Sequence, residues 1–337
     1  MAKTLFDKIW DEHIISSNAG FPDTLYIDTH FINKITSLKA FESLRMRRLP
    51  VFRPKQTIVI TDSGFSQHLP VNELKRFQLD MLNRNCSDFG LEKQEKVGFN
   101  CSEISLTLPG QIIVCDHNQT YNGGVFGAIT IEIGDFQVEQ ILTTQCLLQQ
   151  KPKRMKIEVN GRLAKGLSSK DINHYLISEI SAKGASAYFI EYAGDTITNL
   201  DMEERMAICN MSREIGASGG MIAPDETTFD YIKDFHSSPE DEGWDESLAY
   251  WKTLYSDENS VFDEVLEFDA EDIGPGTYNI GIEKLMPSLS SLDKVRQVSH
   301  ENTWVINGYN EANYILSLKK DIEEYEKSKA YKIFNGV

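Results

Sequence analysis

The chain has 337 residues, of which 41% are apolar, 25% charged and 10% aromatic, and its formal net charge is −17. This length and composition are typical of a globular protein with two or three hydrophobic cores. The negative charge argues against nucleic acid and anionic membranes as partners, because their phosphates would be repelled. A small acidic ligand remains compatible, since a pocket can be locally positive.

The cysteine pattern and the N-terminus indicate the compartment. No apolar signal core opens the sequence, and no run of about 18 apolar residues suited to a membrane span follows it. The cysteines are odd in number, widely spaced and form no C-x-x-C, which favours reduced thiols over a disulfide framework or a zinc site. These features predict a cytoplasmic protein with no membrane segment. The cysteines are Cys86, Cys101, Cys115, Cys146 and Cys209.

Strands and helices alternate along the predicted chain. An amphipathic helix over 4–17 comes first, with Thr4 as its cap and Asp7 three residues later. The alternation that follows predicts an α/β fold with mainly parallel sheets. Strands are predicted at 57–61, 111–115, 154–160 and 186–192, and helices at 136–149, 201–216 and 227–235.

The last hundred residues predict a loop and one βαβ unit. Residues 237–246 are acidic and rich in turn formers, which indicates a surface loop. After a break at 274–276 come a strand at 303–306, a helix at 311–327 and a strand at 330–334. The apolar face of that helix predicts packing against a core. Its members are Ile315, Leu318, Ile322 and Tyr325.

Residues 110–128 are the most informative stretch. An apolar strand through Val114 runs into a polar cluster and then a glycine-rich turn. In α/β proteins, ligand sites form at the carboxyl ends of strands. The sequence therefore predicts a ligand pocket here. The cluster is Cys115, Asp116, His117, Asn118 and Gln119.

Several blocks resemble the aconitase superfamily, and within it the large subunits of isopropylmalate dehydratases. The longest block runs from Cys209 to Phe229, and shorter ones are the opening helix, 26–28, 37–45, 124–128 and 160–163. The resemblance implies stacked α/β domains around a central cleft. The implied domains are 1–150, 151–280 and a truncated remnant of a third domain at 281–337.

The resemblance fails at residues that perform the family's chemistry. Where the family has Asp-His after its first active-site strand, this chain has Asp62-Ser63. The family's Cys-Gly-Asp-Ser-His-Thr is replaced by the sequence 115–120, and Gly123 stands where a later histidine is expected. In the family these groups bind substrate carboxylates and relay protons. Asn118 and Gln119 can hydrogen-bond a carboxylate but cannot act as acid or base near neutral pH.

The family's [4Fe–4S] cluster is also predicted to be absent. The family holds it by three cysteines, the first in a Gly-Ser-Cys-Thr-Asn turn and the others in a later C-x-x-C. The matching turn here carries Tyr309, and no C-x-x-C follows. Because such clusters need thiolates in the correct geometry, we expect no cofactor and no metal. Tyr309 is expected to fill the vacated space, with a role as a phenolic acid as the alternative.

The predicted site combines retained and substituted residues. Asn210 and Glu214 match family active-site positions, and their i, i+4 spacing puts both on one face of a helix; a structural hydrogen-bond network is the alternative role. Cys115 and His117 could form a nucleophile pair, or His117 could act alone as a general base. The predicted catalytic residues are His117, Glu214, Cys115 and Asp62, and the predicted substrate-binding residues are Asp116, Asn118, Gln119, Ser63, Asn210 and Tyr309.

These observations predict a repurposed, cluster-free homologue. It would bind a small polyfunctional carboxylic acid and catalyse an acid–base elimination, addition or isomerisation, in a setting such as specialised metabolism. The alternative is a non-catalytic metabolite-binding or scaffolding homologue, a pseudoenzyme. The resemblance further implies a partner, either a small swivelling subunit or a second copy of the chain.

Overall fold

The computed structural model describes residues 2–32, 37–62, 73–96, 106–116, 123–180, 184–235, 237–239, 242–274, 311–328 and 331–332. The chain divides into two compact units. Unit 1 comprises Met1–Lys151, Ala223–Ser260 and Asp321–Val337, and unit 2 comprises Pro152–Ile222 and Val261–Lys320. The continuous second domain expected at 151–280 is therefore interrupted by a segment that clusters with unit 1. The expected third domain lies largely outside the described residues.

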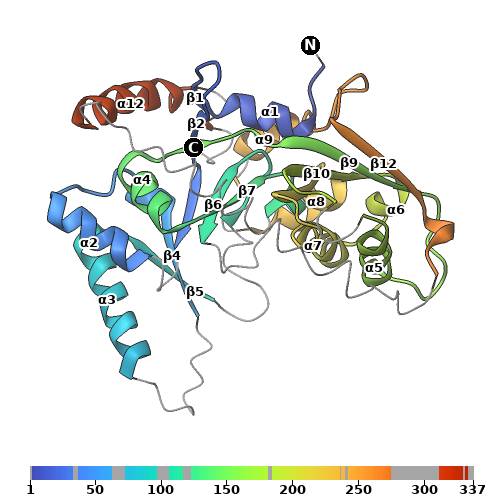
Figure 1. Ribbon diagram of the computed structural model, residues 1–337, viewed down its shortest axis with the longest axis horizontal. Helices are drawn as coiled ribbons and strands as arrows, with labels where there is room; N and C mark the ends of the chain where they lie inside the picture. The colour runs from blue at the N-terminus through green and yellow to red at the C-terminus, as the bar shows by residue number, and fades with distance from the viewer. Residues whose placement is uncertain are drawn as a thin grey trace, which may run out of the picture. The chain divides into compact units, whose positions relative to one another are not determined.

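Unit 1 is built on a five-stranded parallel sheet (Figure 1). Its order is β5-β4-β3-β6-β7. The chain therefore starts at the central strand, moves to one edge, and returns to the centre to build the other half. This makes the gap between β3 and β6 the topological switch point, where open α/β sheets bind ligands. The strands are β3 (Thr29–Ile32), β4 (Thr57–Asp62), β5 (Glu92–Lys96), β6 (Ile112–Asp116) and β7 (Ile129–Ile133).

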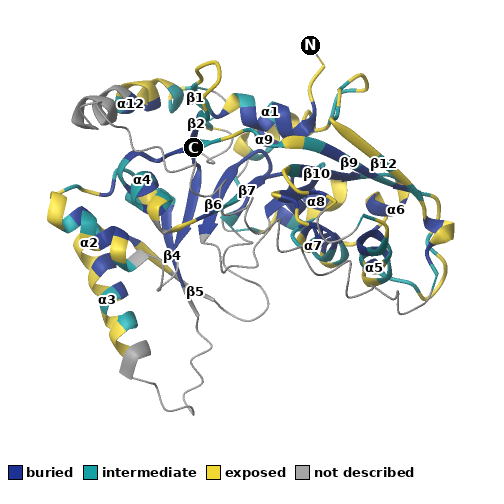
Figure 2. Cartoon of the chain, in the orientation of Figure 1, coloured by how far each residue is buried: buried dark blue, intermediate teal, exposed yellow. Residues whose placement is uncertain are grey.

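The two faces of this sheet are apolar, as a parallel sheet requires. In β3, Phe31 lies in register with Ile58 of β4 and with Cys115 of β6. These side chains form one buried cluster on one face of the sheet, completed by Ile60, Ile113 and Ala128. Buried residues accordingly run along the central strands in Figure 2. The accompanying helices are α2 (Ser37–Arg47), α3 (Glu73–Phe89) and α4 (Asp135–Thr144).

A small antiparallel sheet begins where two predicted helices were expected to continue. Helix α1 (Leu5–Glu12) ends at His13, and Ile14–Ser16 forms β1 instead of a further helical turn. Helix α4 ends at Gln145, whose φ of 56° is left-handed, and Cys146–Gln149 forms β8. Both strands pair antiparallel with β2 (Asp23–Tyr26), so the order of the sheet is β1-β2-β8. Tertiary strand pairing therefore overrode the local helical pattern at both places.

The remaining elements of unit 1 come from distant parts of the chain. Helix α8 (Glu226–Ile232) is capped by Asp225, whose Oδ1 accepts from the Thr228 amide at 3.1 Å. Helix α9 (Glu242–Trp251) occupies half of the stretch predicted to be a loop. Helix α12 (Glu311–Tyr325), which the division between the units crosses after Lys320, buries Leu318 and Ile322, as its apolar face predicted. Residues 331–332 are helical, so the strand predicted at 330–334 is wrong there.

Unit 2 contains a four-stranded parallel sheet with the order β11-β10-β9-β12. It repeats the centre-to-edge winding of unit 1, with its own switch point between β9 and β12. In β9, buried Met155, Ile157 and Val159 alternate with half-buried polar residues. The elements are β9 (Lys153–Asn160), α5 (Ser169–Ile180), β10 (Tyr188–Ala193), α6 (Asp195–Thr198), α7 (Met202–Met211), β11 (Gly219–Ile222), β12 (Glu264–Asp269) and the short helix η4 (Ala270–Asp272).

Across the described segments of both units, no helix combines the length and apolar character that crossing a lipid bilayer requires.

Candidate active site

The carboxyl edge of the unit 1 sheet brings two acidic residues to the switch point. Asp62 is the last residue of β4 and Asp116 the last of β6, and these strands flank β3. Because neighbouring strands lie about 4.8 Å apart, the two chains are separated by about 10 Å at this edge. The backbone thus places one aspartate residue on either side of the place where a ligand is expected.

Several predicted site residues follow this edge directly but lie outside the described part of the chain. Ser63 comes next after Asp62, and His117, Asn118 and Gln119 come next after Asp116. Tyr309 also lies outside the described residues, and the side chains of Asp62 and Asp116 are not described.

The return of the chain from this segment is firmly anchored. The Gly123 amide donates to Thr130 Oγ1 at 2.8 Å, and the Gly110 amide donates to the Gly127 carbonyl at 2.9 Å. Gly127 has a φ of +75°, and a Cβ there would lie 2.6 Å from Cδ of Pro224. Only glycine satisfies both conditions. The segment 117–122 therefore leaves the carboxyl end of β6 and is followed by a turn that is anchored near the amino end of β7.

The Cys115 side chain belongs to the core. It is fully buried and packs in the cluster with Phe31 and Ile113. A thiol in apolar surroundings is disfavoured as a thiolate, which is the nucleophilic form. The surroundings of Cys115 thus favour packing over the nucleophile role that the sequence suggested.

Asn210 and Glu214 are exposed residues of unit 2, and their geometry differs from the expectation. Helix α7 ends at Met211 with Ser212 as its C-cap, so Glu214 lies in the turn beyond the helix. The Glu214 amide donates to the Met211 carbonyl at 2.8 Å, and Gly216 has a φ of +84°. The i, i+4 argument for a shared helical face is therefore wrong. Both side chains nevertheless emerge from the end of the same helix.

Arg205 holds this helix in place and was not anticipated from the sequence. Its side chain is fully buried, and it donates to the carbonyls of Thr198 at 2.6 Å and Leu200 at 3.1 Å. Those carbonyls precede α7, so the guanidinium binds the approach of the chain to the helix. A charged residue within an amphipathic pattern is expected at the surface, and only the tertiary structure shows the buried role of Arg205.

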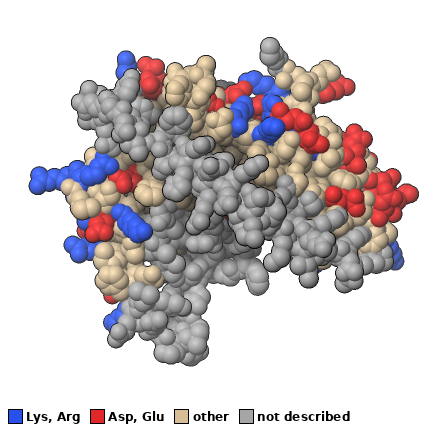
Figure 3. All heavy atoms as spheres, viewed as in Figure 1, with Lys and Arg blue, Asp and Glu red and all other residues tan. Residues whose placement is uncertain are grey.

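Charge is unevenly distributed over the face drawn in Figure 3. Acidic side chains gather there along the exposed edge strand β12 and η4. This agrees with the expectation that polyanions are poor partners. The acidic residues of these elements are Glu264, Glu267, Asp269, Glu271 and Asp272.

Comparison with known proteins identifies the family. A model of the aconitase family (aconitate hydratase) matches residues 7–299. The chain belongs to the aconitase family. It is 45% identical over 334 residues to the 3-isopropylmalate dehydratase large subunit of Cytophaga hutchinsonii, covering 94% of this chain and 72% of that relative. It is 41% identical to the same-named protein of Flavobacterium johnsoniae (95% and 73% covered) and 40% to that of Bacteroides thetaiotaomicron (94% and 72%).

Aconitase-family membership raises the question of an iron–sulfur cluster, and the described cysteines do not fit one. Cys86, Cys115, Cys146 and Cys209 lie on four different elements and are all buried. Burial raises the pKa of the Cys86, Cys146 and Cys209 thiols, which disfavours the thiolates that a cluster needs. Within the described ranges, no three His, Cys, Asp or Glu side chains are placed to hold a metal ion.

Proposed function

We propose that this aconitase-family chain is a cluster-free relative of 3-isopropylmalate dehydratase large subunits. It binds a small polyfunctional carboxylic acid at the carboxyl edge of the unit 1 sheet and catalyses its elimination, addition or isomerisation by side-chain acid–base chemistry. The observation that supports this most is the placement of Asp62 and Asp116 at the ends of β4 and β6, the two strands on either side of β3 and next to the switch point.

His117 is the general base of the proposed reaction. It follows Asp116 at the strand end, and an imidazole titrates near neutral pH, so its neutral form can accept a proton from the carbon beside a carboxylate. Asp62 is a further acid–base candidate at this edge. Ser63, Asp116 and Tyr309 belong to the proposed ligand site, and the side-chain amides of Asn118 and Gln119 can donate hydrogen bonds to carboxylate oxygens. Glu214 and Asn210 belong to unit 2, and their proposed acid–base and ligand-binding roles are carried over from the family positions that they match.

The proposed setting is the cytoplasm, and the proposed partner is a small subunit or a second copy of the chain. The relatives are named large subunits, which supports a small-subunit partner. Buried thiols in both units agree with a reducing compartment.

A binding or scaffolding role without catalysis is the second candidate. It is favoured by the residues at two family catalytic positions, Ser63 and Gly123, neither of which titrates near neutral pH. A pseudoenzyme would bind the same class of ligand and return it unchanged.

The test starts from protein purified from its own host. Native mass spectrometry should detect a bound organic acid, and calorimetric titration with a panel of di- and tricarboxylates should identify its class. Conversion of the bound acid, followed by NMR, separates enzyme from pseudoenzyme. His117→Ala should abolish turnover, whereas His174→Ala should not, because His174 is an exposed residue of α5. Failure of every acid in the panel to bind would refute both candidates.

A further inference from the structure

A cavity of about 730 Å³ lies in unit 1, at the opposite edge of the sheet from Asp62 and Asp116. Four of its lining residues mark the amino ends of four strands. Thr29 opens β3, Gln56 directly precedes β4, Gly90 lies two residues before β5, and Gln111 directly precedes β6. Parallel strands begin at one edge and end at the other, so this cavity is separate from the proposed active site.

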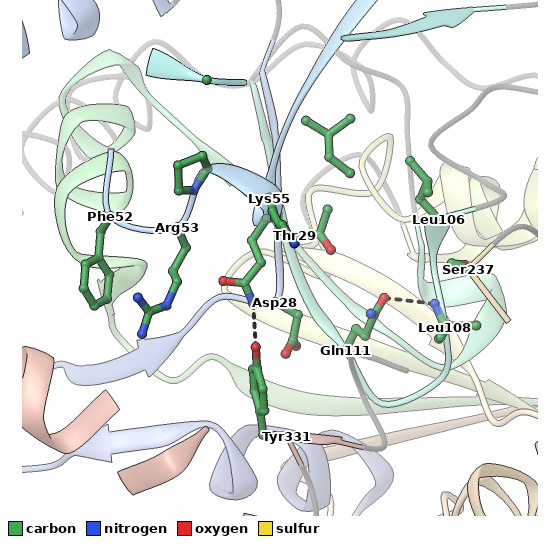
Figure 4. A pocket seen from close by; sticks show the side chains of 14 residues that line it. Asp28, Thr29, Phe52, Arg53, Lys55, Leu106, Leu108, Gln111, Ser237 and Tyr331 are labelled. Carbon is green, nitrogen blue, oxygen red and sulfur yellow. Dashed lines mark hydrogen bonds between the residues drawn. The ribbon is translucent and has the colours of Figure 1, made fainter. Parts of the chain in front are cut away.

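The wall of the cavity is mainly apolar. Its apolar lining comprises Ile58, Leu106 and Leu108, together with Phe52 and Pro54 from the segment before β4. Figure 4 shows Leu106 and Leu108 on one side of the cavity and Phe52 on the other. A volume of this size is typical of sites for small organic molecules. The occupant must therefore carry an apolar body.

The charged residues of the lining leave one uncompensated cation. Arg53 donates from Nε and Nη2 to both carboxylate oxygens of Glu326, at 2.8 and 2.6 Å. Asp28 is paired with His13 at 2.8 Å. Lys55 is exposed at the rim, and among the described residues no carboxylate pairs with its ammonium group. The positive charge of the rim therefore comes from Lys55.

A hydroxyl inside the cavity adds a second polar anchor. Thr29 is only 7% exposed and lines the cavity beside Asp28. Among the described residues nothing hydrogen-bonds its Oγ1, which can donate to a ligand oxygen. Figure 4 shows Lys55 and Thr29 among the side chains that line the cavity.

We propose that this amino-edge cavity binds a monocarboxylic acid with an aliphatic or aromatic body. The carboxylate pairs with Lys55 and accepts from Thr29, and the apolar body lies against Leu106, Leu108 and Ile58. One uncompensated cation selects one carboxylate, in contrast to the polyfunctional acids proposed for the carboxyl edge.

The C-terminal segment forms part of this site. Tyr331 lines the cavity, and Gln56 Nε2 donates to its hydroxyl at 3.3 Å. The Tyr331 ring lies 5.7 Å from that of Tyr26 and 5.9 Å from that of Tyr325. A ligand in the cavity would therefore contact the segment that carries Glu326, and its binding should slow amide exchange there.

The test uses 3-phenylpropanoate as the probe and 3-phenylpropanamide as its neutral match, titrated into the full chain by calorimetry. The acid should bind at least fivefold more tightly than the amide. Lys55→Gln should remove that difference and leave amide binding unchanged. Lys165→Gln, at an exposed lysine of unit 2, is the matched control and should change neither the affinity for the acid nor that for the amide.

Two further measurements locate the site. Leu106→Trp should abolish binding of both probes by filling the cavity. Because that variant could fail to fold, hydrogen exchange on the unaltered chain should show the acid protecting 321–332. His117→Ala should leave binding of the acid unchanged. The proposal is overturned if neither probe binds, if Lys55→Gln has no effect, or if His117→Ala abolishes binding, which would assign the acid to the carboxyl edge.

Discussion

His13 Nε2 lies 2.8 Å from Asp28 Oδ2, and both side chains are completely buried. The other ring nitrogen, Nδ1, lies 2.7 Å from the carbonyl oxygen of Ile9, so both nitrogens face acceptors and the doubly protonated ring fits the site. Burial lowers the pKa of His13, but the charge and hydrogen bond of Asp28 raise it by more, and the net shift is upward. Asp28 also accepts from the Ile112 amide at 2.7 Å. The pair thus ties α1 to the start of β6.

Asp28→Asn should destabilise unit 1 strongly, because it leaves a buried cation without its counterion. The expected loss is about 3–5 kcal/mol in the free energy of unfolding. Urea unfolding followed by the fluorescence of Trp10, which is buried in α1, measures it. Glu226→Gln, which removes an exposed pair with Lys252, is the control and should cost less than about 1 kcal/mol.

The same pair has a predicted pH dependence. A histidine whose folded pKa is raised contributes its stability fully below the unfolded value of 6.5, and loses it as pH rises through the folded pKa. The difference between the unaltered chain and Asp28→Asn should therefore shrink as the pH rises above 6.5. A difference that grows instead would mean that His13 is neutral in the folded state.

His30 predicts the opposite dependence. It is fully buried in β3, neither ring nitrogen has a hydrogen-bond partner, and burial lowers its pKa from 6.5 to about 3. The unfolded chain binds the extra proton between these values, so stability falls as pH drops below 6.5, by about 1.4 kcal/mol per pH unit. His30→Leu should remove this slope. Free energies of unfolding measured at pH 7 and pH 5 test this prediction. An equal change of stability with pH in the unaltered chain and in His30→Leu would contradict it.

The purified protein should take up no iron–sulfur cluster. The described cysteines lie on separate elements, and the sequence resemblance implies Tyr309 at the position of the family's first cluster ligand. Anaerobic reconstitution with iron and sulfide, followed by assay of both and absorbance near 400 nm, is the measurement. Stoichiometric iron with bound sulfide would contradict this prediction. Interconversion of 2- and 3-isopropylmalate is likewise expected to be absent.

His117→Ala should reduce turnover by about 10²–10⁴-fold, the usual effect of losing a general acid or base. Glu214→Gln should have a smaller effect in the same direction. Both variants should keep their melting temperature within a few degrees of the unaltered chain: Glu214 is exposed, and His117 is proposed to act on the ligand. Full activity in His117→Ala would assign the proton transfer to another residue.

The chain is expected to associate, with a small subunit or with itself. Its relatives are named large subunits, and unit 1 exposes Phe136 on α4 by 87% and Phe77 on α3 by 60%. These side chains are available to an association surface, which would cover their apolar area. Light scattering at high micromolar concentration, together with co-purification from the host, checks this. Phe136→Ser should weaken self-association if the α4 face mediates it, and a strict monomer with no co-purifying subunit would contradict the expectation.

The positions of several strands were accessible from the sequence, because buried parallel strands are short apolar runs. The predicted strands at 57–61 and 154–160 match β4 and β9 closely, and Asp62 and Asp116 stand at strand ends as expected. The errors lie where an apolar pattern suits both states. Ile14 and Cys146 continue a helical pattern, but each belongs to a β-strand that pairs with β2. Pairing partners far apart in the chain decide such cases.

The amino-edge cavity could not be predicted in the same way. Its wall combines the starts of four strands with Ser237 and Tyr331, and no local pattern brings these segments together. Arg205 escaped prediction for a related reason, since its acceptors are backbone carbonyls, which every residue carries. Local sequence patterns predict the buried faces and the ends of single elements, whereas a cavity is formed by several elements together.

The interleaving of the two units has a consequence for synthesis. Unit 1 begins with the N-terminal segment but also includes Ala223–Ser260 and Asp321–Val337. In unit 2, β9 pairs with β12 (Glu264–Asp269), which is synthesised about 100 residues later. Neither unit is therefore complete when its first half leaves the ribosome, and the apolar faces of the half-built sheets stay exposed until more than 100 further residues have been made. The nascent chain should consequently depend on chaperones, and splitting the gene at residue 151 should yield two insoluble fragments.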